Sequence, residues 1–176
     1  MTTDLPEDGL PLEVGGTARD ALLAALDAAG VQRNESADRL LAGPEFDGAG
    51  PVQRIRVVER RVADLGLPDG GPLSALLGAA PAQGLRLCPP RTGPHLRLAL
   101  SDQAASPDSV LRAGRAPAAS LTVLSPQALG PDDEPKGFYL RVVDGVRWLR
   151  GFSCTEEHTW SPGDRLVLAL PPSPAG

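Results

Sequence analysis

Aromatic rings, cysteines and lysines are scarce in this chain, and long apolar runs are absent. A membrane-spanning helix needs roughly 20 consecutive apolar residues, and a secretory signal needs a basic start before its apolar stretch. The sequence has neither, so we expect a cytoplasmic protein that does not bind membranes. Its two cysteines, Cys88 and Cys154, then stay reduced. They lie far apart and lack the short cysteine spacing of structural zinc sites, so we expect no metal.

Basic residues are outnumbered by acidic ones, which gives the 176-residue chain a formal net charge of −5. Because nucleic-acid-binding domains are usually basic, we do not expect a nucleic-acid partner. Lys136 is the single lysine beside sixteen arginines, a bias typical of GC-rich bacterial genomes. The sequence also has no phosphate-binding loop, dinucleotide-binding glycine motif, nucleophile elbow or zinc-protease helix motif, and therefore predicts no cofactor.

The length and composition indicate one domain. With 41% hydrophobic and 22% charged residues, the chain has an ordinary globular composition. Residues 1–16 are acidic and rich in proline and glycine, which predicts a flexible arm. We expect a single α+β domain over residues 17–170 and a flexible, proline-rich tail over residues 171–176.

The spacing of apolar residues predicts the first elements of this domain. Two N-terminal helices are expected, one capped by Thr17 and stopped by Gly30, and one that runs from about Asn34 to Ala42. Residues 53–65 fit either a helix or a strand, and their β-branched residues favour a strand.

The rest of the chain predicts a sheet. The strand over residues 53–65, a helix over 72–82 and a strand over 85–88 form a β-α-β unit, in which the second strand lies beside the first. Leucines alternate over residues 95–100, which predicts another strand. Further elements are a surface loop at 101–118, strands at 120–124 and 164–170, and a hairpin at 138–150. The predicted fold is α+β, with two N-terminal helices, a β-α-β unit and a mainly antiparallel sheet of about five or six strands.

The most specific side chains lie near the C-terminal end of the sheet. Five of the six aromatic residues fall within residues 138–160. In this stretch, Asp144-Gly145 separates two apolar segments, which predicts a hairpin with a two-residue turn. Such a turn fixes the pairing of residues 138–143 with residues 146–151.

This register places arginines opposite aromatic rings. Arg141 lies opposite Trp148, and Tyr139 lies opposite Arg150, all on one face. Cation–π contacts of this kind contribute about 0.5–2 kcal/mol, and the same face could bind an unknown protein or a small anionic ligand. The alternative is that the arginine stems merely cover the rings. The predicted ligand-binding residues are Tyr139, Arg141, Trp148, Arg150, His95 and Arg97.

Candidates for catalysis are few. Cys88 and His95 flank a proline-rich turn and could act as a nucleophile and its base if the fold brought them together. Free cysteines are usually buried, so we interpret Cys88 as an inert core thiol. Residues 156–158 combine carboxylates with an imidazole, but a polar loop anchored by a buried Trp160 is the favoured interpretation.

The leading hypothesis is a noncatalytic binding or accessory protein that uses the arginine and aromatic face. The alternatives are an enzyme with a pocket centred on Cys88 and His95, and a structural protein with no small-molecule site. Several segments resemble a family of small bacterial proteins of uncharacterised function. These segments are Leu87-Cys88-Pro89, Gly93-Pro94-His95-Leu96-Arg97-Leu98, Gly137-Phe138-Tyr139-Leu140-Arg141, Asp144-Gly145-Val146 and Trp148-Leu149-Arg150-Gly151. The resemblance covers about residues 20–170 and implies one intact domain, with no activity, catalytic residue or cofactor to carry over.

Overall fold

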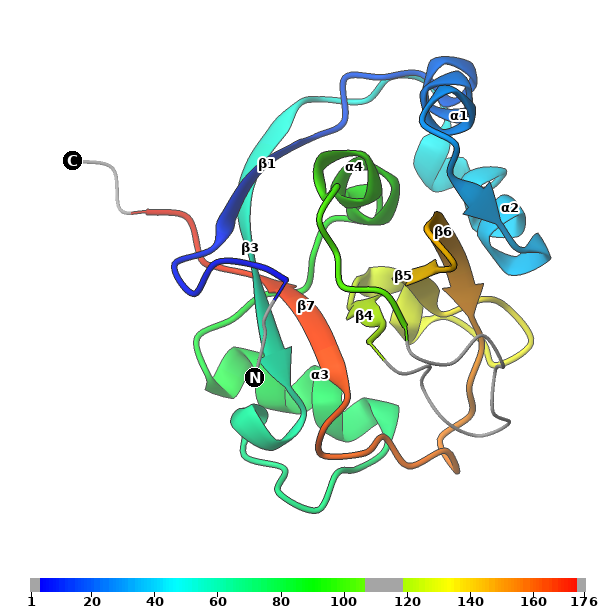
Figure 1. Cartoon of the computed structure of the whole chain (residues 1–176). Coiled ribbons are helices and arrows are strands. Elements are labelled where there is room, and N and C mark those ends of the chain that lie inside the picture. Colours follow the sequence, from blue (N-terminus) through cyan, green and yellow to red (C-terminus); the bar gives the residue numbers. More distant parts are fainter. Residues whose placement is uncertain (1–3, 107–118, 174–176) are drawn as a thin grey trace.

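A curled, mixed β-sheet organises the chain (Figure 1). The structure is a computed structural model that describes residues 4–106 and 119–173. Within them, the seven strands are β1 (Leu10–Val14), β2 (Gln32–Arg33), β3 (Gln53–Arg61), β4 (Leu121–Val123), β5 (Gly137–Val143), β6 (Val146–Phe152) and β7 (Arg165–Ala169). The four α-helices of the described residues are α1 (Arg19–Ala28), α2 (Glu35–Leu41), α3 (Leu73–Ala82) and α4 (Thr92–Ala99).

The strands follow the order β1-β3-β7-β4-β5-β6-β2. Four of the neighbouring pairs are antiparallel, namely β1/β3, β3/β7, β4/β5 and β5/β6. The pairs β4/β7 and β2/β6 are parallel. The α+β class is therefore confirmed, but the sheet is mixed and larger than the five or six strands predicted.

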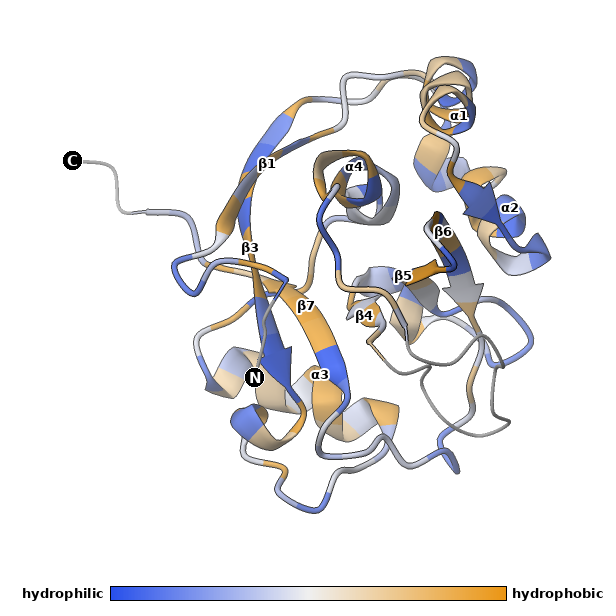
Figure 2. Cartoon of the chain, viewed as in Figure 1, coloured by the Kyte–Doolittle hydropathy of each residue, from blue (hydrophilic) through white to orange (hydrophobic). Residues whose placement is uncertain are grey.

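The central strand β7 is buried on both faces, so its apolar residues run without alternation. Figure 2 shows this apolar run along β7. Val167 belongs to a core cluster that includes residues of α1, α2 and α4. Leu166 and Leu168 point the other way, into a second cluster with α3. The sheet therefore separates two apolar layers.

The helix α4 lies inside the curve of the sheet, between β1 on one side and β5 and β6 on the other (Figure 1). This segment was predicted to be a strand, and that prediction is wrong. Pro94 lies in the first turn of the helix, where its missing N–H costs nothing. Leu96 and Leu100, four residues apart, are both buried, so the leucines that read as strand alternation also fit one side of a helix.

The two N-terminal helices are confirmed. Asn34 caps α2, and its side chain accepts a hydrogen bond from the backbone N–H of Ala37. Gly30 follows α1 with φ of +72°, as expected for a glycine after a helix. Thr17 does not cap α1, because the N-cap position is Ala18 and no side chain caps it.

The β-α-β unit is only partly as predicted. Residues 53–61 form the strand β3, and α3 follows, but residues 85–88 contribute just an isolated bridge between Arg86 and Ala169. The residue of β3 opposite Ala169 is Val57, so β7 lies between Arg86 and β3. The C-terminal strand thus takes the place predicted for residues 85–88.

The first part of the chain is not a flexible arm in the region described. Residues 10–14 form β1, which pairs with β3, and Leu5 is buried in the core. The described part of the predicted tail, residues 171–173, has no helix or strand, and residues 174–176 lie outside the described residues. Residues 101–106 likewise form no helix or strand, and most of the predicted surface loop lies outside the description. No helix in the described part of the chain is long and apolar enough to cross a membrane.

Candidate functional site

The β5–β6 hairpin has the predicted register. Asp144 and Gly145 have φ of +50° and +77°, the left-handed pair that a two-residue hairpin turn requires. Arg141 lies opposite Trp148, and Tyr139 lies opposite Arg150. Local turn chemistry therefore sets which side chains share a face.

Three of these side chains form one contact cluster, which we call the Arg150 cluster: Tyr139, Trp148 and Arg150. The Nε–H of Arg150 donates to the hydroxyl oxygen of Tyr139 at 2.8 Å. The guanidinium carbon lies 5.0 Å from the centre of the Trp148 ring, which is a cation–π contact. Tyr139 is buried, whereas Trp148 and Arg150 are half-buried. The cluster therefore presents a ring and a guanidinium group at the surface.

Arg141 does not extend this exposed surface. Its side chain is 3% exposed, and a terminal nitrogen donates to the hydroxyl of Ser106 at 3.0 Å. The predicted ligand-binding face thus separates into a buried part and a half-exposed part.

His95 and Arg97 do not join this face. The strand predicted to place them on one face is the helix α4, where residues two positions apart point in different directions. The Nε2 of His95 accepts a hydrogen bond from the backbone N–H of Gly15 at 3.2 Å. Burial, and the positive charge of Arg91, lower the pKa of His95.

Arg97 is a fully buried cation. One terminal nitrogen donates to Gln103 Oε1 at 2.7 Å, and the other donates to the carbonyl of Leu100 at 2.6 Å. Burial, and more weakly repulsion from Arg147, lower the pKa of Arg97 to about 10, although the carboxylate of Asp4 acts in the opposite direction. Arg97 therefore ties the C-terminal end of α4 to its surroundings and is not available to a ligand.

Cys88 is sealed in the core. It is fully buried, and its Sγ lies 3.7 Å from the carbonyl oxygen of Val167. Burial raises the pKa of the Cys88 thiol to about 12. Because the thiolate is the nucleophile, this environment opposes covalent catalysis. His95 instead accepts from Gly15, and no hydrogen bond joins Cys88 to His95 in the part of the chain described.

A small cavity of about 210 Å³ lies at the start of α3. Glu156 accepts hydrogen bonds from both the backbone N–H and the hydroxyl of Ser74. Lys136 pairs with Asp132 at 2.9 Å. All three charged side chains that line the cavity, Asp132, Lys136 and Glu156, are therefore engaged within the protein. No local pattern in the sequence marks this cluster, because its members come from separate parts of the chain.

The loop that contains Glu156 is anchored as expected. Trp160 is buried, with the rings of Phe152 and His158 edge-on to it at 5.6 Å and 5.4 Å. His158 thus packs against an aromatic ring, and no hydrogen bond joins it to Glu156 or Glu157 in the structure described.

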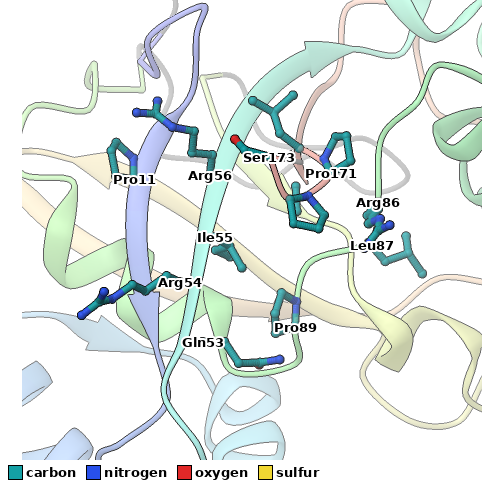
Figure 3. A pocket seen from close by; sticks show the side chains of 13 residues that line it. Pro11, Gln53, Arg54, Ile55, Arg56, Arg86, Leu87, Pro89, Pro171 and Ser173 are labelled. Carbon is teal, nitrogen blue, oxygen red and sulfur yellow. The ribbon is translucent and has the colours of Figure 1, made fainter. Parts of the chain in front are cut away.

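A groove of about 650 Å³ borders the strand β3 (Figure 3). Arginines and prolines are prominent in its lining, but Arg54 and Arg56 direct their guanidinium groups away from Ile55 at its centre (Figure 3). Arg54 binds Glu13, and Arg56 donates to the carbonyls of residues 8 and 9. The groove therefore does not concentrate positive charge on a ligand.

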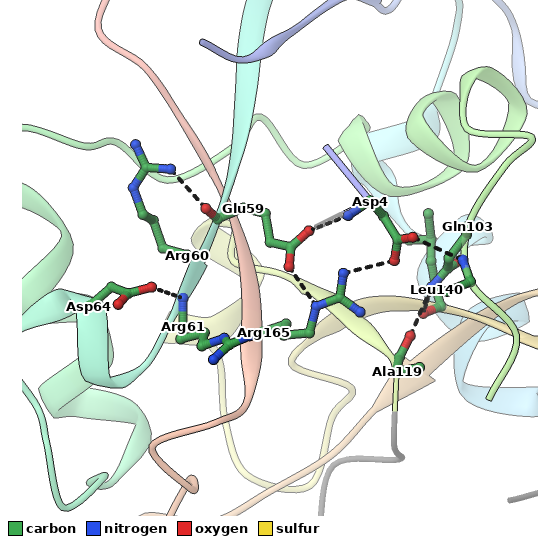
Figure 4. A network of polar contacts seen from close by, with 10 residues as sticks. Asp4, Glu59, Arg60, Arg61, Asp64, Gln103, Ala119, Leu140 and Arg165 are labelled. Carbon is green, nitrogen blue, oxygen red and sulfur yellow. Dashed lines mark hydrogen bonds and ion pairs between the residues drawn. The ribbon is translucent and has the colours of Figure 1, made fainter. Parts of the chain in front are cut away.

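A buried polar network involves side chains of the strands β3 and β7 (Figure 4). Arg165 forms ion pairs with Asp4 at 2.8 Å and with Glu59 at 2.5 Å. Gln103 donates to the carbonyls of Leu140 and Ala119. No local pattern marks Asp4, because the acidic composition of its segment is typical of disorder.

Among the described residues there is no group of three or more side chains that could hold a metal ion. Comparison with models of known protein families, with curated proteins and with solved structures finds no match to this chain.

Proposed function

We propose that this protein is a noncatalytic binding or accessory domain that recognises a carboxylate on a partner protein through the Arg150 cluster. One observation carries the proposal. Tyr139 and Trp148 hold the Arg150 guanidinium in place, yet Arg150 forms no ion pair with a carboxylate of the residues described.

The geometry of the guanidinium group supports this role. Arginine has five N–H donors in a planar fork, and its two terminal nitrogens match the two oxygens of a carboxylate. The bond to Tyr139 uses Nε–H, so the terminal nitrogens remain for a partner. Because the side chain is already oriented, binding costs less conformational entropy than it would for a mobile arginine.

The ring of Trp148 adds an apolar contact beside this charge. Tryptophan and arginine are the residues that most often dominate protein interfaces. A partner that carries an aspartate or glutamate next to an apolar side chain would satisfy both groups. The cluster is half-buried, so the ion pair would be less screened than one on an open surface.

An enzyme is less well supported. The Cys88 thiol is buried with a raised pKa, and the charged groups near Glu156 are engaged with each other or with backbone. Membership of the small bacterial family that the motifs resemble, and a cytoplasmic location, stay predictions.

The test is an NMR titration of the full chain with two probes, an acetylated and amidated Asp-Leu-Glu peptide and inorganic phosphate. We expect saturable shifts of the Trp148 indole N–H with the peptide. The variant Arg150→Lys keeps the charge but loses the fork, and should abolish these shifts. Arg54→Lys is the matched control, because Arg54 is an exposed arginine of another strand.

Two results would contradict the proposal. Equal shifts in wild type and Arg150→Lys would show that the peptide binds elsewhere. An absence of shifts with the peptide, together with a loss of stability in Arg150→Lys, would show that the guanidinium group only covers Tyr139 and Trp148. Shifts of the Trp148 indole N–H with phosphate but not with the peptide would indicate that the Arg150 cluster binds a small anionic ligand and not a protein partner.

A further inference from the structure

The segment Asp4–Val14, which we call the β1 arm, is held by contacts with residues that all come later in the chain. Its strand pairs with β3 through five residues, from Leu10 opposite Val57 to Val14 opposite Gln53. Leu5 is 2% exposed and lies in the main core cluster. The arm is therefore bound to the rest of the protein in the way that a peptide is bound to a receptor.

An ion network fixes the far end of the arm (Figure 4). The Asp4 carboxylate accepts from Arg165 at 2.8 Å and from the backbone N–H of Ala104 at 2.9 Å. The backbone N–H of Asp4 donates to Glu59 at 2.9 Å. The side chains of Asp4 and Glu59 are 3% and 4% exposed, so the contact is specific and largely shielded from water.

The negative charge of Asp4 is also needed nearby. Asp4 opposes the lowering of the Arg97 pKa, and the buried set of Asp4, Glu59, Arg97 and Arg165 contains two acidic and two basic side chains. Without the arm, Arg165 would keep one carboxylate, Glu59, and Arg97 would lose the opposing charge of Asp4. This site therefore requires a carboxylate, whichever chain supplies it.

The arm is joined to α1 through a tight double-glycine hinge. Gly15 and Gly16 have φ of +92° and +76°. A Cβ at Gly15 would lie 2.1 Å from the carbonyl oxygen of Pro51, so no other residue fits this turn without a shift. His95 accepts the N–H of Gly15, which holds the hinge in its closed form.

We propose that the β1 arm is exchangeable, and that two copies of this chain form a dimer in which each arm occupies the site of the other copy. The arm makes the same contacts in the monomer and in the exchanged dimer. The equilibrium between them therefore depends on the conformation of the hinge and on the translational entropy lost when two chains associate. Short hinge loops under strain favour such exchange, and any side chain at Gly15 would strain the closed turn.

The second copy is the occupant that fits this site best, because its arm supplies the same strand, leucine and carboxylate. β1 is an edge strand, and Pro11 has no N–H to offer to a further strand. Pro11 therefore opposes edge-to-edge growth of the sheet, and reciprocal exchange of two arms leaves no site open for a third copy.

The test uses the full chain as two variants, Glu13→Cys and Arg54→Cys, each combined with Cys154→Ser to remove the half-buried thiol. Glu13 lies directly opposite Arg54 in the β1/β3 pair. Their side chains are 64% and 84% exposed, so the changes leave the core intact. The two variants are mixed at high concentration and oxidised, and the products are separated by mass. We expect a disulfide-linked heterodimer that joins the two substituted positions.

Two controls calibrate this measurement. Both substitutions on one chain should give an intramolecular disulfide, which shows that the pair can bond. A mixture of Glu35→Cys with Arg54→Cys measures random collisions, because Glu35 is exposed on α2 and lies outside the arm. Heterodimer at or below the level of this collision control would overturn the proposal.

A hinge variant provides a second measurement. Gly15→Ala strains the closed turn, and we expect it to raise the dimer fraction measured by light scattering after size-exclusion chromatography. Gly30→Ala is the matched control, because Gly30 also has positive φ but a Cβ there meets no atom within 4 Å. A folded Gly15→Ala variant that stays fully monomeric would contradict exchange. If this variant does not fold, the cross-linking result decides alone.

Discussion

Replacing Gly145 with valine tests the hairpin turn on which the Arg150 cluster depends. Gly145 has φ of +77°, and a Cβ added there meets no atom within 4 Å. The penalty is therefore backbone strain alone, about 1–2 kcal/mol for an L-residue in the left-handed region, and β-branching increases it. Reduced freedom of the unfolded chain offsets about 0.4–1 kcal/mol. We expect a net loss of about 1 kcal/mol of unfolding free energy.

The assay is urea unfolding followed by tryptophan fluorescence, with the melting temperature as a second measure. For a chain of this size, 1 kcal/mol corresponds to about 2–4 °C. Gly145→Asn is the matched variant, because asparagine tolerates positive φ better than other non-glycine residues. It should lose less stability than Gly145→Val. Unchanged stability of Gly145→Val would refute the reasoning, and with it the turn that places Tyr139 and Arg150 together.

Three further perturbations test the interior. Cys88 should resist iodoacetamide in the folded protein and react once denaturant is added, whereas the half-buried Cys154 should react sooner; fast native labelling of Cys88 would contradict its burial. Asp4→Asn leaves a buried arginine short of a carboxylate and should lower the unfolding free energy by about 3–5 kcal/mol, whereas Glu13→Gln, in an exposed pair, should cost at most ~1 kcal/mol. Equal effects of these two changes would show that the Asp4 network is not a stabilising contact. The pKa of His95 is lower in the folded chain than its ordinary value of about 6.5. As the pH falls, the unfolded chain therefore binds the proton first, and the free energy of unfolding should decrease below about pH 6.5. The variant His95→Gln should lack this decrease when unfolding is measured as a function of pH.

Local signals predicted the parts of the fold that depend on neighbours in the sequence. The register of β5 and β6 follows from Asp144-Gly145 and from alternation alone, and the structure has the predicted pairs. Asn34 caps α2 for an equally local reason. The same register placed Tyr139 beside Arg150 without any tertiary information.

Long-range contacts decided the rest. Residues 10–14 belong to an acidic, proline-rich segment that predicts a flexible arm, and they form a strand because the distant β3 offers an edge. Leucines at 96, 98 and 100 fit both the period of a strand and that of a helix. The helix α4 forms here and packs against β1, β5 and β6, inside the curve of the sheet. No local pattern could show that β7 would enter between β3 and Arg86.

The sequence by itself determined the hairpin, the two N-terminal helices and the chemical character of the Arg150 cluster. Only the tertiary structure decided which of the candidate side chains remain accessible. Arg97 and Arg141 are buried, and Arg150 is not, although all three are arginines near apolar residues. The physical reason is that accessibility depends on what packs against a side chain. The contacting groups come from distant parts of the chain: Ser106 at Arg141, and the carbonyls of Arg141 and Trp148 at Arg97.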